Sequence, residues 1–126
     1  MTDKLRIMVI DDEPIVGKRL KRLLEKEGYD IKVFTEGATA IEELEKRHFD
    51  IIITDLKMEN TDGMKILSIA RMLNPYTKVI IITGFAQTET AREALDKGAF
   101  DFIIKPFKIE DLKDVVKRAG QEQKQS

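Results

Sequence analysis

The sequence contains no cysteine, so neither a disulfide framework nor a thiolate metal site can form in this chain. It also lacks an excess of either charge, because 22 basic and 23 acidic residues leave a formal net charge of −1. A surface that binds nucleic acid or a membrane normally needs a basic excess on one face. We therefore expect neither a nucleic acid nor a membrane among the partners.

Long apolar runs are absent as well, and the longest are too short to span a bilayer. The first residues lead directly into a strand-like segment without a signal-peptide pattern, so the reducing cytoplasm is the expected location. The 126 residues fit one domain, and 42% apolar residues are enough to form a hydrophobic core.

Two hydrophobic periodicities alternate along the chain. Short apolar runs, such as the three isoleucines from Ile51 to Ile53, are typical of strands covered on both faces. They predict strands at residues 5–10, 31–34, 50–54, 78–83 and 101–104. Apolar residues at helical spacing predict helices from residue 14 to a stop at Gly28, and at residues 38–47, 61–73, 88–97 and 109–119. Gly98 is the predicted stop of the helix at 88–97.

Five successive strand–helix units predict an α/β fold in which helices cover both faces of a parallel sheet. Right-handed crossovers between the strands restrict the topology further. Residues 1–120 are expected to form this single domain, and residues 121–126 a polar, frayed tail.

Polar residues stand where the predicted strands end. The first strand runs into Asp11 and Asp12, the third into Asp55, the fourth into Thr83 and the fifth into Lys105. Because parallel strands end at the same edge of a sheet, and ligands bind outside that edge, these side chains are expected to converge.

The predicted cluster combines acidic, basic and hydroxyl groups. Asp11, Asp12 and Asp55 would repel one another unless a proton or a cation relieves them. Carboxylate oxygens without histidine or cysteine favour Mg²⁺. Together with the positive charge of Lys105 and the hydroxyl of Thr83, such a site suits phosphoryl transfer.

A simpler interpretation is that the acidic residues before Pro14 only cap the following helix. This alternative explains an Asp-Asp pair by itself. It does not explain why Asp55, Thr83 and Lys105 stand at the matching ends of three other strands, so we favour the functional interpretation.

These residues lie in segments that resemble the receiver domains of two-component response regulators. The matching segments are Val9-Ile10-Asp11-Asp12-Glu13-Pro14, Ile53-Thr54-Asp55-Leu56-Lys57-Met58, Asp62-Gly63, Ile82-Thr83-Gly84 and Ile104-Lys105-Pro106-Phe107. The resemblance covers residues 5–119. It implies a flavodoxin-like, doubly wound sheet of five parallel strands in the order 2-1-3-4-5, with five helices.

The resemblance implies a role for each polar residue at the strand ends. Asp55 is the expected phosphoacceptor, with Thr83 hydrogen-bonded to the phosphoryl group and Lys105 paired with it. The expected ligands of Mg²⁺, for which Mn²⁺ can substitute, are the carboxylates of Asp12 and Asp55 and the backbone carbonyl of Lys57, with Asp11 bound largely through water.

A conformational switch is also implied by the resemblance. Phosphorylation adds roughly two negative charges at Asp55. Thr83 is expected to move toward them and to free space for the ring of Phe102, which changes the surface formed by residues 88–97, 101–104 and 109–119. The thin apolar stripe of the helix at 88–97, chiefly Ala91, Ala94 and Leu95, suits an element that shifts. The Lys105–Pro106 bond is expected to be cis.

The implied partners lie on both sides of this switch. A sensor histidine kinase, a phosphotransfer protein or a small phosphodonor is expected to supply the phosphoryl group, with the first helix as a docking surface. An output domain or partner protein is expected to bind the changed surface. Phosphorylation-linked homodimerisation, common in the family, is a further expectation.

Two residues depart from the family pattern. Glu59 stands four residues after Asp55, where many members carry proline, so its loop is expected to be more mobile or less favourable to a phosphoryl group. Phe85, two residues after Thr83, either shields the acyl phosphate from water or packs within its loop. The single histidine, His48, is interpreted as a solvated residue at a helix end, without a role in the site.

Two other classes of protein fit the sequence less well. A phosphatase of the haloacid-dehalogenase type needs a second acid two residues after its aspartate, where this chain has Lys57, and usually has a cap domain. An interaction module with an inactive site would not need Asp12, Asp55, Thr83 and Lys105 together. The sequence thus predicts a signalling switch, with no enzymatic activity beyond self-phosphorylation and autodephosphorylation.

Overall fold

Strands and helices alternate along the whole of the chain that the computed structural model describes, which is residues 4–58, 61–84 and 88–125. The strands are β1 (Arg6–Ile10), β2 (Asp30–Phe34), β3 (Ile51–Asp55), β4 (Lys78–Thr83) and β5 (Asp101–Ile104). The helices are α1 (Pro14–Glu25), α2 (Gly37–Lys46), α3 (Gly63–Leu73), α4 (Thr88–Asp96) and α5 (Ile109–Gln125). Within the described ranges, none of the helices combines the length and apolar character needed to cross a bilayer.

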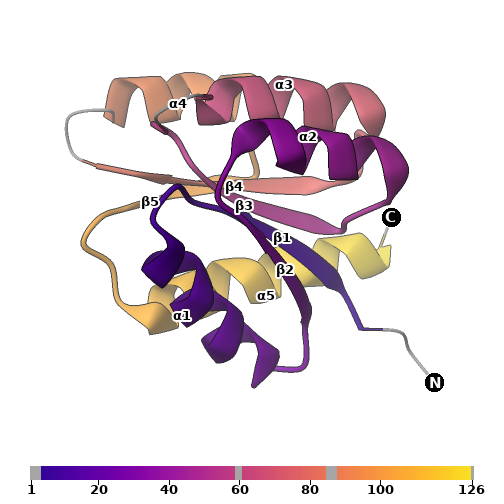
Figure 1. Cartoon of the computed structure of the whole chain (residues 1–126), viewed down its shortest axis with the longest axis vertical. Helices are drawn as coiled ribbons and strands as arrows, with labels where there is room; N and C mark the ends of the chain where they lie inside the picture. Colours follow the sequence, from indigo (N-terminus) through magenta and orange to yellow (C-terminus); the bar gives the residue numbers. More distant parts are fainter. Residues whose placement is uncertain (1–3, 59–60, 85–87, 126) are drawn as a thin grey trace.

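The five strands form one parallel sheet in the order β2-β1-β3-β4-β5. Helices α2, α3 and α4 cover one face of this sheet, and α1 and α5 cover the other (Figure 1). The predicted flavodoxin-like, doubly wound α/β fold is therefore confirmed, including its strand order.

Each face of the sheet carries its own hydrophobic core. Side chains alternate along a strand, so Ile51 and Ile53 pack toward the leucines and valines of α1 and α5. Ile52, between them, packs toward α2 and α3 instead. Because both faces are covered, every residue of β3 is buried, which explains its unbroken apolar sequence.

Two glycines end helices as predicted. Gly28 follows α1 and Gly98 follows α4, and both have a positive φ, 94° and 108°. This left-handed conformation is easily reached only by a residue without a side chain. The stop signals in the sequence therefore reflect a backbone requirement.

Some predicted boundaries are wrong. β3 includes Asp55 instead of ending at Thr54, and α3 begins at Gly63 rather than Thr61 because the Asp62 side chain accepts a hydrogen bond from the Lys65 backbone N–H. α5 was predicted to end at Ala119 but continues to Gln125.

The extension of α5 has a physical cause that its polar sequence conceals. Gly120 is buried and lies against Leu5, and a Cβ there would come within 2.8 Å of the leucine side chain. Glu122 then forms an ion pair with Lys78 at 3.6 Å, at the start of β4. These contacts hold the last helical turns near the sheet.

Helix α4 packs on the sheet through very small side chains. Ala91 and Ala94 are fully buried, whereas Leu95, predicted to join them, is 37% exposed. Two methyl groups bury little apolar area, so α4 is held less firmly than helices packed through leucine or isoleucine.

Replacing the two positive-φ glycines by alanine is expected to separate backbone strain from packing. Gly28→Ala should lower the free energy of unfolding by about 1–2 kcal/mol, the cost of a left-handed backbone at alanine. No packing clash adds to this cost, because no atom lies within 4 Å of the added methyl group. Gly98→Ala should lower it by about 2–3 kcal/mol, because its Cβ would lie 2.6 Å from Nε of Arg71 and would displace that side chain from its hydrogen bond to the Pro75 carbonyl. Urea unfolding followed by circular dichroism measures both losses, and equal losses would contradict this account.

Candidate functional site

The parallel pairing brings four strand ends to one edge of the sheet. Asp11 follows β1 directly, Asp55 ends β3, Thr83 ends β4 and Lys105 follows β5. β1, β3, β4 and β5 are consecutive neighbours in the sheet, so these four residues lie along one edge of it. The side chains of Asp11, Asp55 and Lys105 are close enough for their charges to act on one another, and Thr83 lies at the same edge.

Three acidic residues at this edge could hold a metal ion. Asp11, Asp12 and Asp55 each offer one carboxylate oxygen, and these oxygens lie within 4.8 Å of one another. Hard carboxylate oxygens in such a cluster suit Mg²⁺ or a similar cation. The cluster is the only such group found among the residues that the structure describes.

Asp11 is the most unusual of the three carboxylates because it is only 1% exposed. Its Oδ1 accepts a hydrogen bond of 2.9 Å from the Glu13 backbone N–H, but its buried Oδ2 has no hydrogen-bond partner in the described part of the chain. Burial raises the pKa of Asp11 above its ordinary value, and the nearby charge of Asp55 raises it further. A buried carboxylate oxygen without a partner is what a cation site requires.

The capping interpretation of the acidic segment finds little support in this geometry. Glu13 occupies the N-cap position of α1, yet its side chain makes no capping hydrogen bond. The Asp11 carboxylate instead accepts a hydrogen bond from the Glu13 backbone N–H in its own loop, and one of its oxygens lies within 4.8 Å of oxygens of Asp12 and Asp55.

Lys105 balances the charge of Asp55 directly. Its Nζ donates a hydrogen bond of 2.9 Å to Oδ2 of Asp55, whose side chain is largely buried. Burial lowers the pKa of Lys105, but the hydrogen bond to Asp55 and the charges of Asp55, Asp11 and Glu13 outweigh it and raise the pKa. The ammonium is thus firmly charged beside Asp55. The Lys105–Pro106 bond is cis, as predicted.

The other predicted residues differ in how they relate to this pair. The Lys57 backbone N–H donates to Oδ1 of Asp55 at 3.4 Å, which places the Lys57 peptide next to the cluster. Thr83 is buried and its hydroxyl donates to the Gly84 carbonyl at 3.2 Å. Phe102 is half-buried and packs against the core on the α2–α4 face. Glu59 and Phe85 lie outside the described residues.

A groove that the sequence does not predict lies beside the acidic cluster. A hollow of about 820 Å³ runs between α1 and the segment after β5, where Lys105, Pro106 and Phe107 form one wall. Ile15, on the opposite wall, is 80% exposed. The sequence feature that could have indicated this groove is Ile15, an apolar residue outside the buried stripe of α1.

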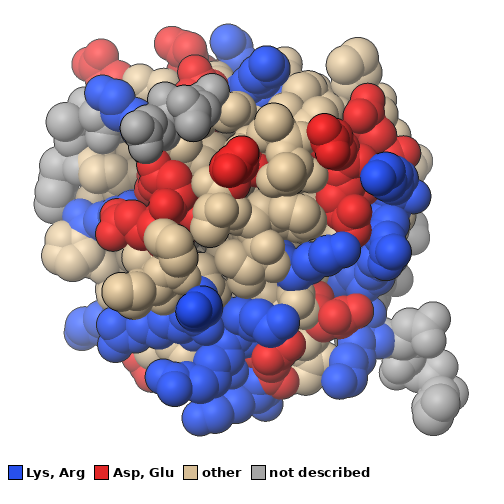
Figure 2. All heavy atoms as spheres, viewed as in Figure 1, with Lys and Arg blue, Asp and Glu red and all other residues tan. Residues whose placement is uncertain are grey.

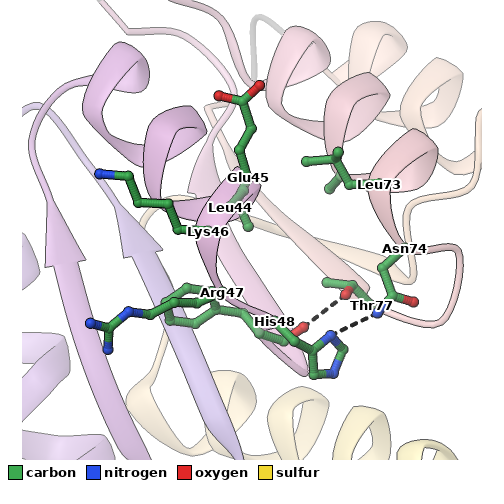
Figure 3. A pocket seen from close by; sticks show the side chains of 10 residues that line it. Leu44, Glu45, Lys46, Arg47, His48, Leu73, Asn74 and Thr77 are labelled. Atoms are coloured by element: carbon green, nitrogen blue, oxygen red, sulfur yellow. Dashed lines mark hydrogen bonds between the residues drawn. The ribbon is translucent and has the colours of Figure 1, made fainter.

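A second hollow, of about 270 Å³, lies between the carboxyl ends of α2 and α3 (Figure 3). His48 lines it, with its Nε2 3.1 Å from Oδ1 of Asp50 and its Nδ1 2.7 Å from the Asn74 amide nitrogen. His48 precedes β3 and Asp55 ends it, so the histidine belongs to the opposite edge of the sheet. The prediction of a merely solvated histidine was incomplete, since its ring connects two loops.

Fold and edge together define a class of protein, a doubly wound α/β domain whose strand ends gather an acidic cluster and a lysine-paired aspartate. The family model of the response regulator receiver domain matches residues 7–117. The chain therefore belongs to the response regulator receiver domains.

Relatives and solved structures agree with this assignment. The regulatory protein AtoC of Escherichia coli is 38% identical over 96% of this chain, which spans only 26% of AtoC. A response regulator receiver domain from Clostridium thermocellum has a TM-score of 0.88 and 32% identity, over 95% of this chain and 97% of that one. The beryllofluoride-activated NtrC4 receiver domain, a dimer, has a TM-score of 0.87 and 32% identity, over 94% and 98%.

Removing the charge of Asp11 is expected to stabilise the protein when divalent cations are absent. Asp11→Asn should raise the free energy of unfolding at neutral pH by about 1 kcal/mol, since the amide has no charge to desolvate and can donate to a neighbouring carboxylate. Urea unfolding in the presence of a chelator measures this gain. Asp30→Asn, at an exposed position, is the matched control and should change little.

The same gain should depend on pH. Because the folded pKa of Asp11 is raised above 3.8, the native state binds this proton more tightly than the unfolded chain does. The wild type therefore loses stability as the pH rises through the interval between these two pKa values. The gain in the free energy of unfolding from Asp11→Asn should shrink as the pH falls through that interval. If Asp11→Asn is less stable than the wild type at neutral pH, the raised pKa assigned to Asp11 is contradicted.

Proposed function

We propose that this chain is a phosphorylation-activated switch in which Asp55 accepts a phosphoryl group. The observation that carries the proposal is the position of the Asp55 carboxylate, which lies in a cluster with Asp11 and Asp12 and accepts a hydrogen bond from Lys105. One carboxylate is thereby held between a candidate cation site and a fixed positive charge.

The donor in the proposed reaction is the phosphohistidine of a sensor kinase or phosphotransfer protein, or a small acyl phosphate or phosphoramidate. An oxygen of Asp55 attacks the phosphorus, and a new P–O bond forms while the bond to the leaving group breaks. The leaving group departs with that electron pair, and an aspartyl phosphate remains. Lys105 stabilises the negative charge on the transferred group.

The residues at this edge fit Mg²⁺, with Mn²⁺ able to substitute. The proposed ligands are the carboxylates of Asp11, Asp12 and Asp55 and the backbone carbonyl of Lys57. The Oδ2 atom of Asp11, which has no hydrogen-bond partner among the described residues, supports this proposal. When bound, the ion supplies positive charge for the phosphoryl oxygens. The chain needs no other catalytic group, so we propose no enzymatic activity beyond self-phosphorylation and autodephosphorylation.

The proposed output is a change in the surface formed by α4, β5 and α5. The Thr83 hydroxyl, now bonded to Gly84, would turn toward the phosphoryl oxygens, and Phe102 would follow into the vacated space. The slight packing of α4 through Ala91 and Ala94 supports such a shift. An output domain or partner protein, or a second copy of the chain, is the proposed reader, and the dimer of the activated NtrC4 receiver domain supports the last of these.

Phosphorylation of Asp55 can be tested with a small phosphodonor. After incubation with Mg²⁺ and acetyl phosphate or phosphoramidate, intact mass should show the stable gain of one phosphoryl group. The gain should vanish in Asp55→Asn and in the presence of a chelator, and persist in the control Asp30→Asn. A phosphoryl group retained by Asp55→Asn, or turnover of many phosphate esters, would overturn the proposal.

The groove beside α1 is the proposed docking surface for the phosphodonor protein. It opens next to Lys105 and combines exposed Ile15 with Arg19 and Arg22. Figure 2 shows that basic side chains gather over α1, in the lower part of the view. An acidic and apolar helical surface on the donor would complement this groove.

Charge reversal on α1 is expected to affect the protein donor alone. With a purified kinase that phosphorylates the wild type, Arg19→Glu should slow phosphoryl transfer about tenfold. Labelling by acetyl phosphate should stay within about twofold, since a small donor makes no contact with the groove. Lys26→Glu, after the end of the same helix and outside the groove, is the matched control. Equal effects of the two substitutions would rule out docking at the groove.

A further inference from the structure

The Asp62-Gly63 segment is one of the segments that match the receiver family, but neither residue belongs to the site described above. Asp62 caps α3, and Gly63 is the first residue of that helix. The described glycines with a positive φ are Gly28 and Gly98, so Gly63 does not serve a left-handed turn. Another physical reason must explain a glycine at the start of α3.

That reason is the space between α3 and the end of β3. A Cβ on residue 63 would lie 2.7 Å from the carbonyl oxygen of Asp55 and 2.9 Å from Cα of Leu56. Both neighbours are backbone atoms, which cannot rotate away as the end of a side chain can. Any side chain at position 63 would therefore push α3 away from the residue proposed to accept the phosphoryl group.

The backbone that Gly63 approaches is held from both sides. The Leu56 N–H donates to the Ile82 carbonyl in β4 at 2.8 Å, and the Leu56 carbonyl accepts from the Gly63 N–H at 2.7 Å. The Leu56 peptide groups are thus fixed between the sheet and the first turn of α3. They separate the Asp55 side chain from the Lys57 carbonyl, the two groups that the candidate cation site needs in a fixed relation.

We propose that Gly63 is a positioning residue for the metal and phosphoryl site. By lacking a side chain, it lets α3 begin close enough to hydrogen-bond the Leu56 carbonyl, and this bond holds Asp55 and the Lys57 carbonyl in one geometry. The inference rests on the proposed function of Asp55 and adds a residue that touches neither the ion nor the phosphoryl group.

A purely structural glycine would give a different result from a positioning one. If Gly63 only permitted dense packing, its replacement would lower stability and leave the folded site intact. If it positions the site, the folded variant should bind a metal ion poorly. Gly98→Ala supplies the matched comparison, because Gly98 also contacts another element closely but lies between α4 and β5, at the opposite edge of the sheet.

The test measures Mn²⁺ affinity from the loss of the free Mn²⁺ signal in electron paramagnetic resonance. Wild type, Gly63→Ala and Gly98→Ala are compared under conditions where circular dichroism shows each to be folded. Gly63→Ala should bind Mn²⁺ on the order of tenfold more weakly than the wild type, the size of effect seen when outer groups that orient metal ligands are lost. It should also take phosphoryl groups from phosphoramidate more slowly, whereas Gly98→Ala should match the wild type in both. Equal Mn²⁺ affinity of the two variants would overturn the inference.

A second variant covers the case in which Gly63→Ala does not fold. Asp62→Ala removes the cap at the Lys65 N–H without adding any clash, so the first turn of α3 loosens. It should weaken Mn²⁺ binding by about threefold relative to Gly98→Ala, a smaller effect of the same kind, and an unchanged affinity would contradict the inference. The wild type distinguishes failure of the proposed function of Asp55 from failure of the positioning role of Gly63. A wild type that neither binds Mn²⁺ nor gains a phosphoryl group would refute the proposed function itself.

Discussion

The parallel pairing of β1, β3, β4 and β5 is the constraint on which the rest of this structure depends. Parallel strands end at the same edge, so the residues after each apolar run must share a small space. Asp55 pairs in register with Ile82, and Thr83 pairs with Ile104, the residue before Lys105. Residues up to 94 positions apart in sequence, from Asp11 to Lys105, are thereby brought into one electrostatic group. Helices on both faces fix the sheet and leave this edge open.

The electrostatics of that edge are incompletely balanced in the protein alone. Lys105 neutralises part of the charge of Asp55, but Asp11 keeps a buried oxygen without a partner among the described residues. Burial of a carboxylate opposes its ionisation, so the cluster is more favourable with a cation than without one. The buried carboxylate of Asp11 thus lowers the stability of the protein without a cation, at the place where the proposed function needs a cation and an incoming phosphoryl group.

Rigidity and mobility are distributed unevenly around the site. On one side, Gly63 and Ile82 hold the Leu56 peptide groups through short hydrogen bonds. On the other, α4 rests on the sheet through Ala91 and Ala94. A firmly held proposed acceptor beside a lightly packed helix suits the proposed switch, since a charge added at a fixed point can then shift a helix that few apolar contacts hold. The proposed docking groove for the phosphodonor lies along α1 and includes no residue of α4.

The sequence by itself determined the alternation of strands and helices, the two glycine stops and the polar residues at the strand ends, because hydrophobic period, positive φ and residue type are local properties. The end of α5 was mispredicted, because it depends on contacts with two residues distant in sequence, Leu5 and Lys78. Leu95 was predicted to join the buried stripe of α4 but is exposed. The exposure of Ile15, the groove beside it and the hydrogen bonds of His48 were equally hidden. Only the tertiary structure decided which oxygen of Asp11 has no partner among the described residues and why position 63 needs a glycine. Both depend on atoms that the fold, and not the chain order, brings within 4.8 Å of one another.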